Sequence, residues 1–224
     1  MHLDILVKAY ATTEFTNRLG LASALSFVGD DRACWLFLNT LTNEMKGRTL
    51  TGNEADIMTS LATRFGILAR RSDTAYRFII EQGSWPSFWS KHRPWKRAED
   101  DELVNDQLAG WCIKFLGYSE RPDLDKVLEE LKSRHEQGFP RRFSGAIVDA
   151  AYRQSVVRRY GFIEAGDSVL RDLEASLPEF MKWIESPEGK LWEEWSNQVD
   201  RTEMQRNKVP VMRQTNWNAP AVIP

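Results

Sequence analysis

The stretch GNEADIMTSLATRFG, residues 52–66, shows most clearly how this chain folds. Its apolar side chains recur at intervals of three and four residues, which places on one helical face Ile57, Met58, Leu61, Ala62 and Phe65. Gly66 then stands where a glycine commonly ends a helix. The spacing therefore predicts a helix that buries one face and ends at Gly66.

Two further stretches have the same character. RPDLDKVLEELKSRHEQGFP, residues 121–140, carries one apolar helical face and closes with glycine and proline. SPEGKLWEEWSNQVDR, residues 186–201, begins with Ser186 as a predicted N-cap and Pro187 at the first helical position. Alternating strand patterns are nearly absent. We therefore expect an all-α protein of roughly eight to ten helices.

Segments of the first half of the chain recur in the same order in the second half. Residues 17–29 resemble residues 105–117, and four shorter blocks follow, at offsets between 88 and 95 residues. One of these blocks pairs Gly66 with Gly161. The pattern predicts an internal duplication. The alternative is that any two helical segments share caps and apolar spacing.

The duplication divides the chain into three parts. We expect a first helical module over residues 1–97 and a second, related module over residues 98–186. Residues 187–224 would form a C-terminal helix and an extended, proline-containing arm. The arm, residues 208–224, is too apolar for a solvated tail, so we expect it to pack on a protein surface. That surface is either the chain's own body or a neighbouring subunit, which would be a protein partner or a second copy in a homo-oligomer.

Composition narrows the class of protein. The 224 residues carry a net charge of −2, with 42% hydrophobic and 28% charged residues, which is typical of a chain with a substantial core. Both cysteines, Cys34 and Cys112, lie in apolar surroundings, which predicts buried free thiols. We see no secretory signal and no apolar run of the ~20 residues that a membrane span needs. These features predict a soluble, cytoplasmic protein without a membrane contact.

The stretch SWPSFWSKHRPWKR, residues 84–97, is the strongest functional signal. Basic side chains contact phosphates and tryptophan rings stack on bases, so the stretch favours a DNA- or RNA-binding surface. The expected phosphate contacts are Arg70, Arg71, Lys91, Arg93, Lys96 and Arg97, with Trp89 and Trp95 for stacking. The alternative is that the tryptophans join the two modules while Lys96 and Arg97 pair with the acidic run at 99–102.

A helix-turn-helix-like arrangement is a second possible route to DNA. Arg70, Arg71 and Arg77 surround the predicted start of the helix that follows Gly66. Against it, the connection from Gly66 to Ser72 is longer than the usual turn of 3–4 residues, and Asp73 would point an acid at the phosphates. A plain helix–loop–helix explains the same pattern.

Signals for catalysis are weak. The three histidines are scattered, and none stands at metal-ligand spacing with another histidine, a cysteine or an acid. No glycine-rich phosphate loop and no nucleophile elbow appears. We therefore expect no cofactor, no metal and no enzyme activity. The preferred function is non-catalytic nucleic-acid binding within a larger assembly. The alternative is a protein-interaction or structural subunit whose Trp-rich junction and C-terminal arm make subunit contacts.

Overall fold

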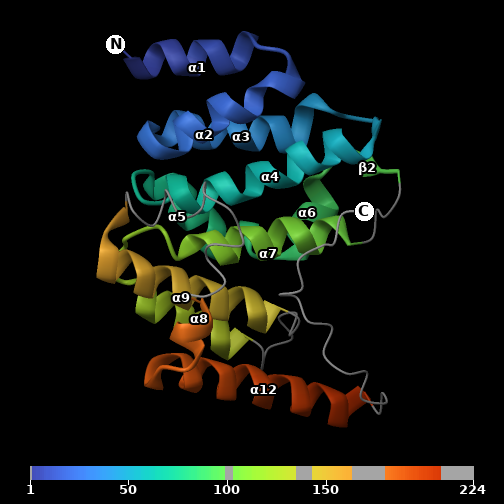
Figure 1. Ribbon diagram of the computed structural model, residues 1–224. Coiled ribbons are helices and arrows are strands. Elements are labelled where there is room, and N and C mark those ends of the chain that lie inside the picture. The colour runs from blue at the N-terminus through green and yellow to red at the C-terminus, as the bar shows by residue number, and fades with distance from the viewer. Residues whose placement is uncertain (1, 99–102, 135–142, 163–179, 208–224) are drawn as a thin grey trace, which may run out of the picture.

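Helices make up almost all of the computed structural model, which describes residues 2–98, 103–134, 143–162 and 180–207 (Figure 1). The all-α prediction is confirmed. Within these residues no helix combines the length and the apolar character needed to cross a membrane. The predicted C-terminal arm, residues 208–224, lies outside the described residues.

The chain is built from the following elements. The helices are α1 (His2–Thr12), α2 (Arg18–Val28), α3 (Asp31–Asn39), α4 (Gly52–Leu68), α5 (Asp73–Phe78), α6 (Pro86–His92), α7 (Val104–Leu116), α8 (Leu124–Ser133), α9 (Ser144–Tyr160) and α12 (Pro187–Asn207). A 3-10 turn, η1 (Phe15–Asn17), precedes α2, and the π-helical turns η2 (Thr40–Glu44) and η3 (Ile79–Gly83) extend α3 and α5. The two-residue strands β1 (Thr49–Leu50) and β2 (Lys96–Arg97) pair in parallel.

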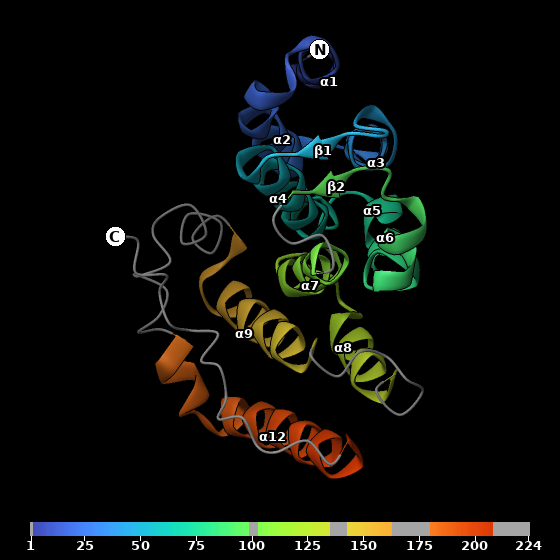
Figure 2. The same ribbon diagram turned by 90° about the vertical axis from the view of Figure 1, so that its right-hand side faces the viewer.

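The helices are stacked in the order in which they occur in the sequence. One layer runs from α2 through α4, α7 and α9 to α12, and each of these helices packs on the next. The helices α3, α5, α6 and α8 lie along one side of this layer, and α1 lies at its end, against α2 and α3 (Figure 2). Because the extensive contacts join elements that are near in sequence, the architecture resembles that of helical-repeat proteins.

Position 66 requires a glycine because α4 and α7 cross there. The prediction from the sequence that Gly66 ends a helix was wrong. Gly66 does not end a helix, because α4 continues to Leu68. Instead, a Cβ at Gly66 would lie 2.3 Å from the backbone carbonyl carbon of Phe115. Gly66 therefore allows the backbones of α4 and α7 to meet, at the most extensive helix contact in the described part of the molecule.

The internal duplication is not confirmed. Gly161 ends α9 with a φ of +82°, a left-handed conformation that favours glycine, whereas Gly66 lies inside α4. The two glycines therefore have different roles. Residues 163–179, which would hold the second module's counterpart of α5, are outside the described residues.

Other local predictions match the structure. The Ser72 hydroxyl accepts a hydrogen bond from the Ala75 amide and caps α5, and the Ser186 hydroxyl accepts one from the Gly189 amide at the start of α12. Cys34 and Cys112 are both free and fully buried. Burial raises the pKa of the Cys34 thiol to about 12, so this group stays protonated at neutral pH.

Candidate nucleic-acid interface

The structure separates the predicted basic residues into two groups. Arg70 and Arg71 follow the C-terminal end of α4, whereas Lys96 and Arg97 form β2, which pairs with the strand that precedes α4. A helix of 17 residues is about 25 Å long, at 1.5 Å per residue. The two groups thus lie at opposite ends of α4 (Figure 1). They do not form one continuous surface.

The two tryptophans expected to stack on bases are buried. Trp89 and Trp95 are 0% and 1% exposed. The indole N–H of Trp89 donates to the Gly83 carbonyl at 2.9 Å, and that of Trp95 to the Leu41 carbonyl at 3.0 Å. Neither ring offers a face to a base, so the expected stacking role of Trp89 and Trp95 is dropped. Apolar interior neighbours, rather than a ligand, account for these aromatic side chains.

Three of the predicted phosphate contacts are half-buried arginines with partners inside the protein. Arg70 pairs with Glu120, and its guanidinium lies 4.3 Å from the ring centre of Phe162. Arg93 donates through Nε to Asn105 Oδ1 at 2.9 Å and lies over the Trp95 ring. Arg97 is 3.5 Å from Asp56 Oδ1. These contacts reduce what Arg70, Arg93 and Arg97 can offer to a phosphate.

The helix-turn-helix expectation fails on the position of α5. This helix has six residues, of which Ala75, Tyr76 and Phe78 are buried. It packs on α3 and α4 and continues directly into η3, so it is not free to enter a DNA groove. Arg71, beside it, is exposed and contacts the Phe27 carbonyl at 3.4 Å.

The second basic group gains members that the sequence did not indicate. The Gly47 amide bonds to the Pro94 carbonyl, and the Lys96 amide to the Arg48 carbonyl, both at 3.0 Å. These bonds bring residues 46–48 beside residues 91–97. We call the exposed cations gathered there the corner patch, which consists of Lys46, Arg48, Lys91 and Lys96. Figure 2 faces this corner and shows β1, β2, α3 and α6 together.

The corner patch has a local excess of positive charge. Arg48 pairs with Glu54 at 2.8 Å, but Lys46, Lys91 and Lys96 have no ion pair within the described part of the chain. Behind the patch, Arg97 lies 3.5 Å from Asp56 Oδ1 and Arg93 donates to Asn105 Oδ1. Three exposed lysines that have no ion pair among the described residues thus belong to this patch, on a protein whose net charge is −2.

A shallow cleft of about 390 Å³ lies between α5 and the turn before α8. It is lined by Asp73, Tyr76, Arg77, Ile80, Glu81, Arg121, Pro122 and Asp123. Arg121 is held by Asp73 at 2.6 Å and by the Ala69 carbonyl at 2.8 Å. The Tyr76 hydroxyl donates to Asp123 Oδ1 at 3.1 Å. Within the cleft, Asp73 is thus bonded to Arg121, and Tyr76 is bonded to Asp123.

Tyr76 is the titratable group of the cleft whose pKa departs from its ordinary value. Burial, followed by the charge of Asp123 and the hydrogen bond to it, raises the pKa of the Tyr76 phenol, so the phenol stays protonated at neutral pH. The hydrogen bond to Asp123 also uses the hydroxyl proton. The cleft is best described as a junction between α5 and α8.

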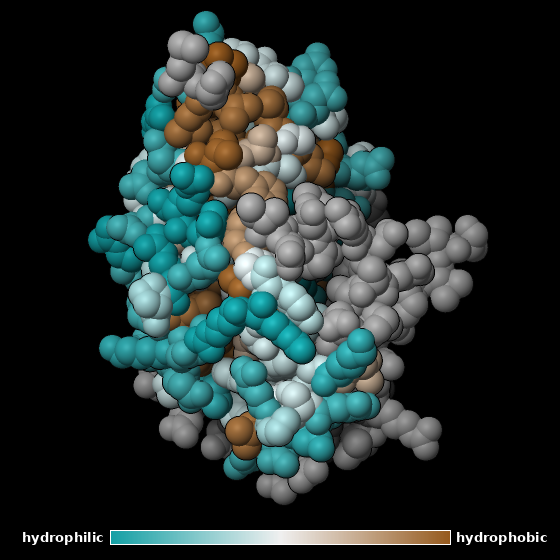
Figure 3. Space-filling view, turned by 60° about the vertical axis from the view of Figure 1, so that its left-hand side comes forward, coloured by the Kyte–Doolittle hydropathy of each residue, from teal (hydrophilic) through white to brown (hydrophobic). Residues whose placement is uncertain are grey.

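Apolar side chains are also exposed at the N-terminal end of the helical stack. Figure 3 shows them gathered over the end where α1 and α2 lie. Ile5 on α1 is 60% exposed and Val28 on α2 is 47% exposed. Trp35, on α3, is 62% exposed, the highest value among the large aromatic side chains described. Such side chains commonly mark a contact with another molecule.

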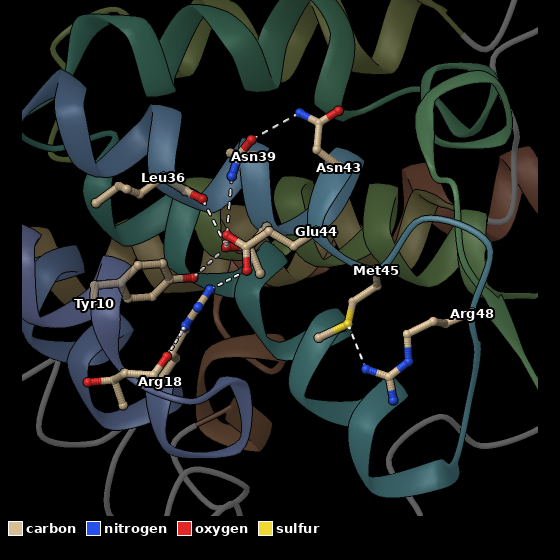
Figure 4. Close-up of polar contacts among 10 residues, drawn as sticks. Tyr10, Arg18, Leu36, Asn39, Asn43, Glu44, Met45 and Arg48 are labelled. Atoms are coloured by element: carbon tan, nitrogen blue, oxygen red, sulfur yellow. Dashed lines mark hydrogen bonds and ion pairs between the residues drawn. The ribbon is translucent and has the colours of Figure 1, made fainter.

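A polar network joins α1 to η2 near the corner patch (Figure 4). The carboxylate of Glu44 accepts hydrogen bonds from Arg18, from the Thr40 hydroxyl at 3.1 Å and from the Asn39 amide at 3.2 Å. The Tyr10 hydroxyl lies 3.1 Å from Thr40, and burial raises its pKa to about 12. Arg18 neutralises the negative charge of Glu44, so Glu44 does not offset the positive charge of the lysines in the corner patch.

Among the described residues, no group of three or more histidine, cysteine, aspartate or glutamate side chains is placed to hold a metal ion. Comparison of the chain with models of protein families, with curated proteins and with solved structures found no match. The functional argument therefore rests on the geometry described above.

Proposed function

We propose that this protein binds nucleic acid without catalysis, through contacts between the corner patch and the phosphate backbone. The observation that carries the proposal is the parallel pairing of β1 and β2, which brings the backbone at Lys46 and Arg48 beside the backbone at Lys96, five residues after Lys91 on α6. Lysines bind phosphates as point charges and carry no sequence information. Binding of this kind depends on charge and is insensitive to base sequence.

The proposal requires strong salt dependence. Each phosphate contact made to a single strand changes the slope of log K against log salt by about 0.7. The net charge of −2 gives no long-range attraction, so the affinity should be measurable mainly at low ionic strength. Fluorescence anisotropy of a labelled 20-nucleotide oligothymidylate, titrated at 20 to 200 mM NaCl, measures both the affinity and the slope.

Replacement of Lys46, Lys91 and Lys96 by glutamine tests the patch. All three side chains are exposed, so the melting temperature should stay unchanged. We expect the affinity at low salt to fall at least tenfold and the slope to decrease by about two.

The matched control is replacement of Lys126, Arg159 and Lys190 by glutamine, because these exposed cations lie on α8, α9 and α12, away from the patch. The control changes the net charge equally and should leave the slope unchanged. If both triple variants weaken binding alike, the corner patch is not the site. If the parent protein does not bind the oligonucleotide at 20 mM NaCl, the proposed function is wrong.

A second candidate function is a protein-interaction subunit. It is favoured by the exposed Ile5 and Val28 at the α1–α2 end. The Trp-rich junction does not support it, because Trp89 and Trp95 are buried within the chain. Light scattering after size exclusion tests it: self-association that is unaffected by salt and abolished by Ile5→Glu would favour this candidate.

A further inference from the structure

The helix formed by α3 and η2 carries a line of exposed side chains that leads to the corner patch. Its exposed positions are Arg32, Trp35, Asn39, Asn43 and, just beyond η2, Lys46. The residues between them include the buried Ala33, Cys34, Phe37, Thr40 and Leu41. We call this line the α3 ridge. It connects an exposed aromatic ring, two amides and a cation.

Trp35 provides the aromatic surface that Trp89 and Trp95 do not. Its side chain is 62% exposed, and within the described part of the chain its ring contacts no other ring and no cation. Its indole N–H donates to no described group. Tryptophan is enriched among the residues that contribute most to binding at interfaces, so an exposed ring is a candidate contact for a ligand or a partner.

The two amides lie between Trp35 and the corner patch. The Asn43 amide donates to Asn39 Oδ1 at 3.1 Å, and the Asn39 amide donates to Glu44 Oε1 at 3.2 Å (Figure 4). These bonds orient both side chains and leave Asn43 Oδ1 without a hydrogen bond from any described residue. Arg18 pairs with Glu44, Arg32 is shared by Asp30 and Asp4, and Asp31 accepts hydrogen bonds from Ser72 and Thr74.

The length of the ridge fits a short run of nucleotides. Trp35 and Lys46 are eleven residues apart, or about 16 Å at the α-helical rise of 1.5 Å per residue. Stacked nucleotides of one strand are spaced about 3.4 Å apart, so the ridge can accompany roughly five of them. A tryptophan can stack on a base only where the base presents a free face, as it does in a single strand.

We propose that Trp35 is the base-stacking residue of this protein and that the α3 ridge guides a single strand toward the corner patch. The inference rests on the proposed nucleic-acid binding and adds a substrate class to it, namely single-stranded rather than double-stranded nucleic acid. Trp35 supplies stacking, the amides of Asn39 and Asn43 supply hydrogen bonds that any base can accept, and Lys46 supplies the first phosphate contact.

The test compares three variants on two probes. The probes are labelled oligothymidylate of 20 nucleotides and its duplex with oligoadenylate. Trp35→Leu keeps an apolar side chain but removes the ring, Trp35→Phe keeps a smaller ring, and Ile5→Ala removes an exposed apolar side chain on α1 as a control. Because the Trp35 side chain is largely exposed, the melting temperature of each Trp35 variant should match that of the parent.

We expect the parent to bind the single strand more tightly than the duplex. Trp35→Leu should weaken single-strand binding by about ten- to one-hundredfold, which corresponds to the loss of one stacked base. The salt slope should stay the same, since no phosphate contact is lost. Trp35→Phe should retain most of the affinity, and Ile5→Ala all of it.

Different experimental results would contradict the stacking role of Trp35 and the proposed nucleic-acid binding. If the lysine variant weakens binding but Trp35→Leu binds like the parent, the stacking inference is overturned while the proposed function stands. Equal parental affinity for single strand and duplex also overturns the inference. If Trp35→Leu changes only the mass in solution, Trp35 belongs to a protein interface and the inference is overturned. If neither probe binds the parent protein, the proposed function itself fails.

Discussion

Replacing Gly66 by alanine should destabilise the protein, because α4 and α7 leave no room for a methyl group where they cross. A Cβ at Gly66 would lie 2.3 Å from the carbonyl carbon of Phe115 and 2.6 Å from its Cβ. Carbon atoms in contact are normally about 3.5–4.0 Å apart. The two helices must therefore separate by roughly 1 Å, which weakens contacts along their whole shared surface.

The size of the effect follows from two opposing terms. Overpacking of an interior contact costs about 1–3 kcal/mol and sometimes more. Alanine in place of a helical glycine contributes about 0.5–1 kcal/mol in the other direction. Since α4 and α7 form the most extensive helix contact described, the cost should lie at the upper end, and we expect a net loss of about 2 kcal/mol. For a chain of this size that lowers the melting temperature by about 4–8 °C.

Urea unfolding followed by circular dichroism measures the free energy of unfolding of the variant and of a matched control. Gly20 is an exposed glycine inside α2, and a Cβ there would meet nothing within 4 Å. Gly20→Ala should therefore raise the free energy of unfolding by about 0.5–1 kcal/mol. The two substitutions should have opposite signs. If Gly66→Ala is as stable as the parent or more so, the close crossing of α4 and α7 is refuted.

Two further predictions concern single side chains. Trp95→Phe removes the hydrogen bond to the buried Leu41 carbonyl, so the free energy of unfolding, measured by thermal unfolding, should fall by about 1–3 kcal/mol. The affinity for nucleic acid should stay unchanged. Weaker binding at unchanged stability would contradict the burial of Trp95. The Ser72 hydroxyl, at 2.5 Å, and then Thr74 hold the pKa of Asp31 below its ordinary value. A lowered folded-state pKa stabilises the protein above the unfolded-state pKa of about 3.9, and this contribution is lost as pH falls. The stability difference between the parent and Asp31→Asn should therefore shrink between about pH 5 and pH 3, and a difference that is constant with pH would contradict the effect.

The fold class and the helix caps could be predicted because they depend on local sequence. Apolar periodicity and the capping residues Ser72 and Ser186 act within one or two helical turns. The role of Gly66, in contrast, could not be predicted from local sequence. Its role depends on Phe115, a residue about fifty positions away, and nothing in the local pattern distinguishes a glycine at a helix crossing from a glycine at a helix end.

The candidate site was predicted less well for the same physical reason. The sequence pointed to Trp89 and Trp95 because they stand among basic residues, but exposure is set by which elements cover a ring, and both rings face the core. Lys46 lies near Lys96 only because the chain pairs β1 with β2, a contact between segments about fifty residues apart. Basic residues slightly outnumber acidic residues over residues 1–97, but this excess does not indicate where Lys46 lies in the fold.

The π-helical turn η2 gives the α3 ridge its alignment. In a regular α-helix, residues four apart turn progressively away from a straight line, because 3.6 residues complete a turn. A turn closed by i→i+5 hydrogen bonds is wider, so residues four apart stay closer to one line, and such turns recur at functional sites. With η2 over Thr40–Glu44, Asn39 and Asn43 remain in register, which their hydrogen bond reflects. The same turn places Glu44 against Arg18, so the carboxylate at its end is matched by an interior cation. The Asn39–Asn43 hydrogen bond and the ion pair of Glu44 with Arg18 thus both lie at this one irregular turn.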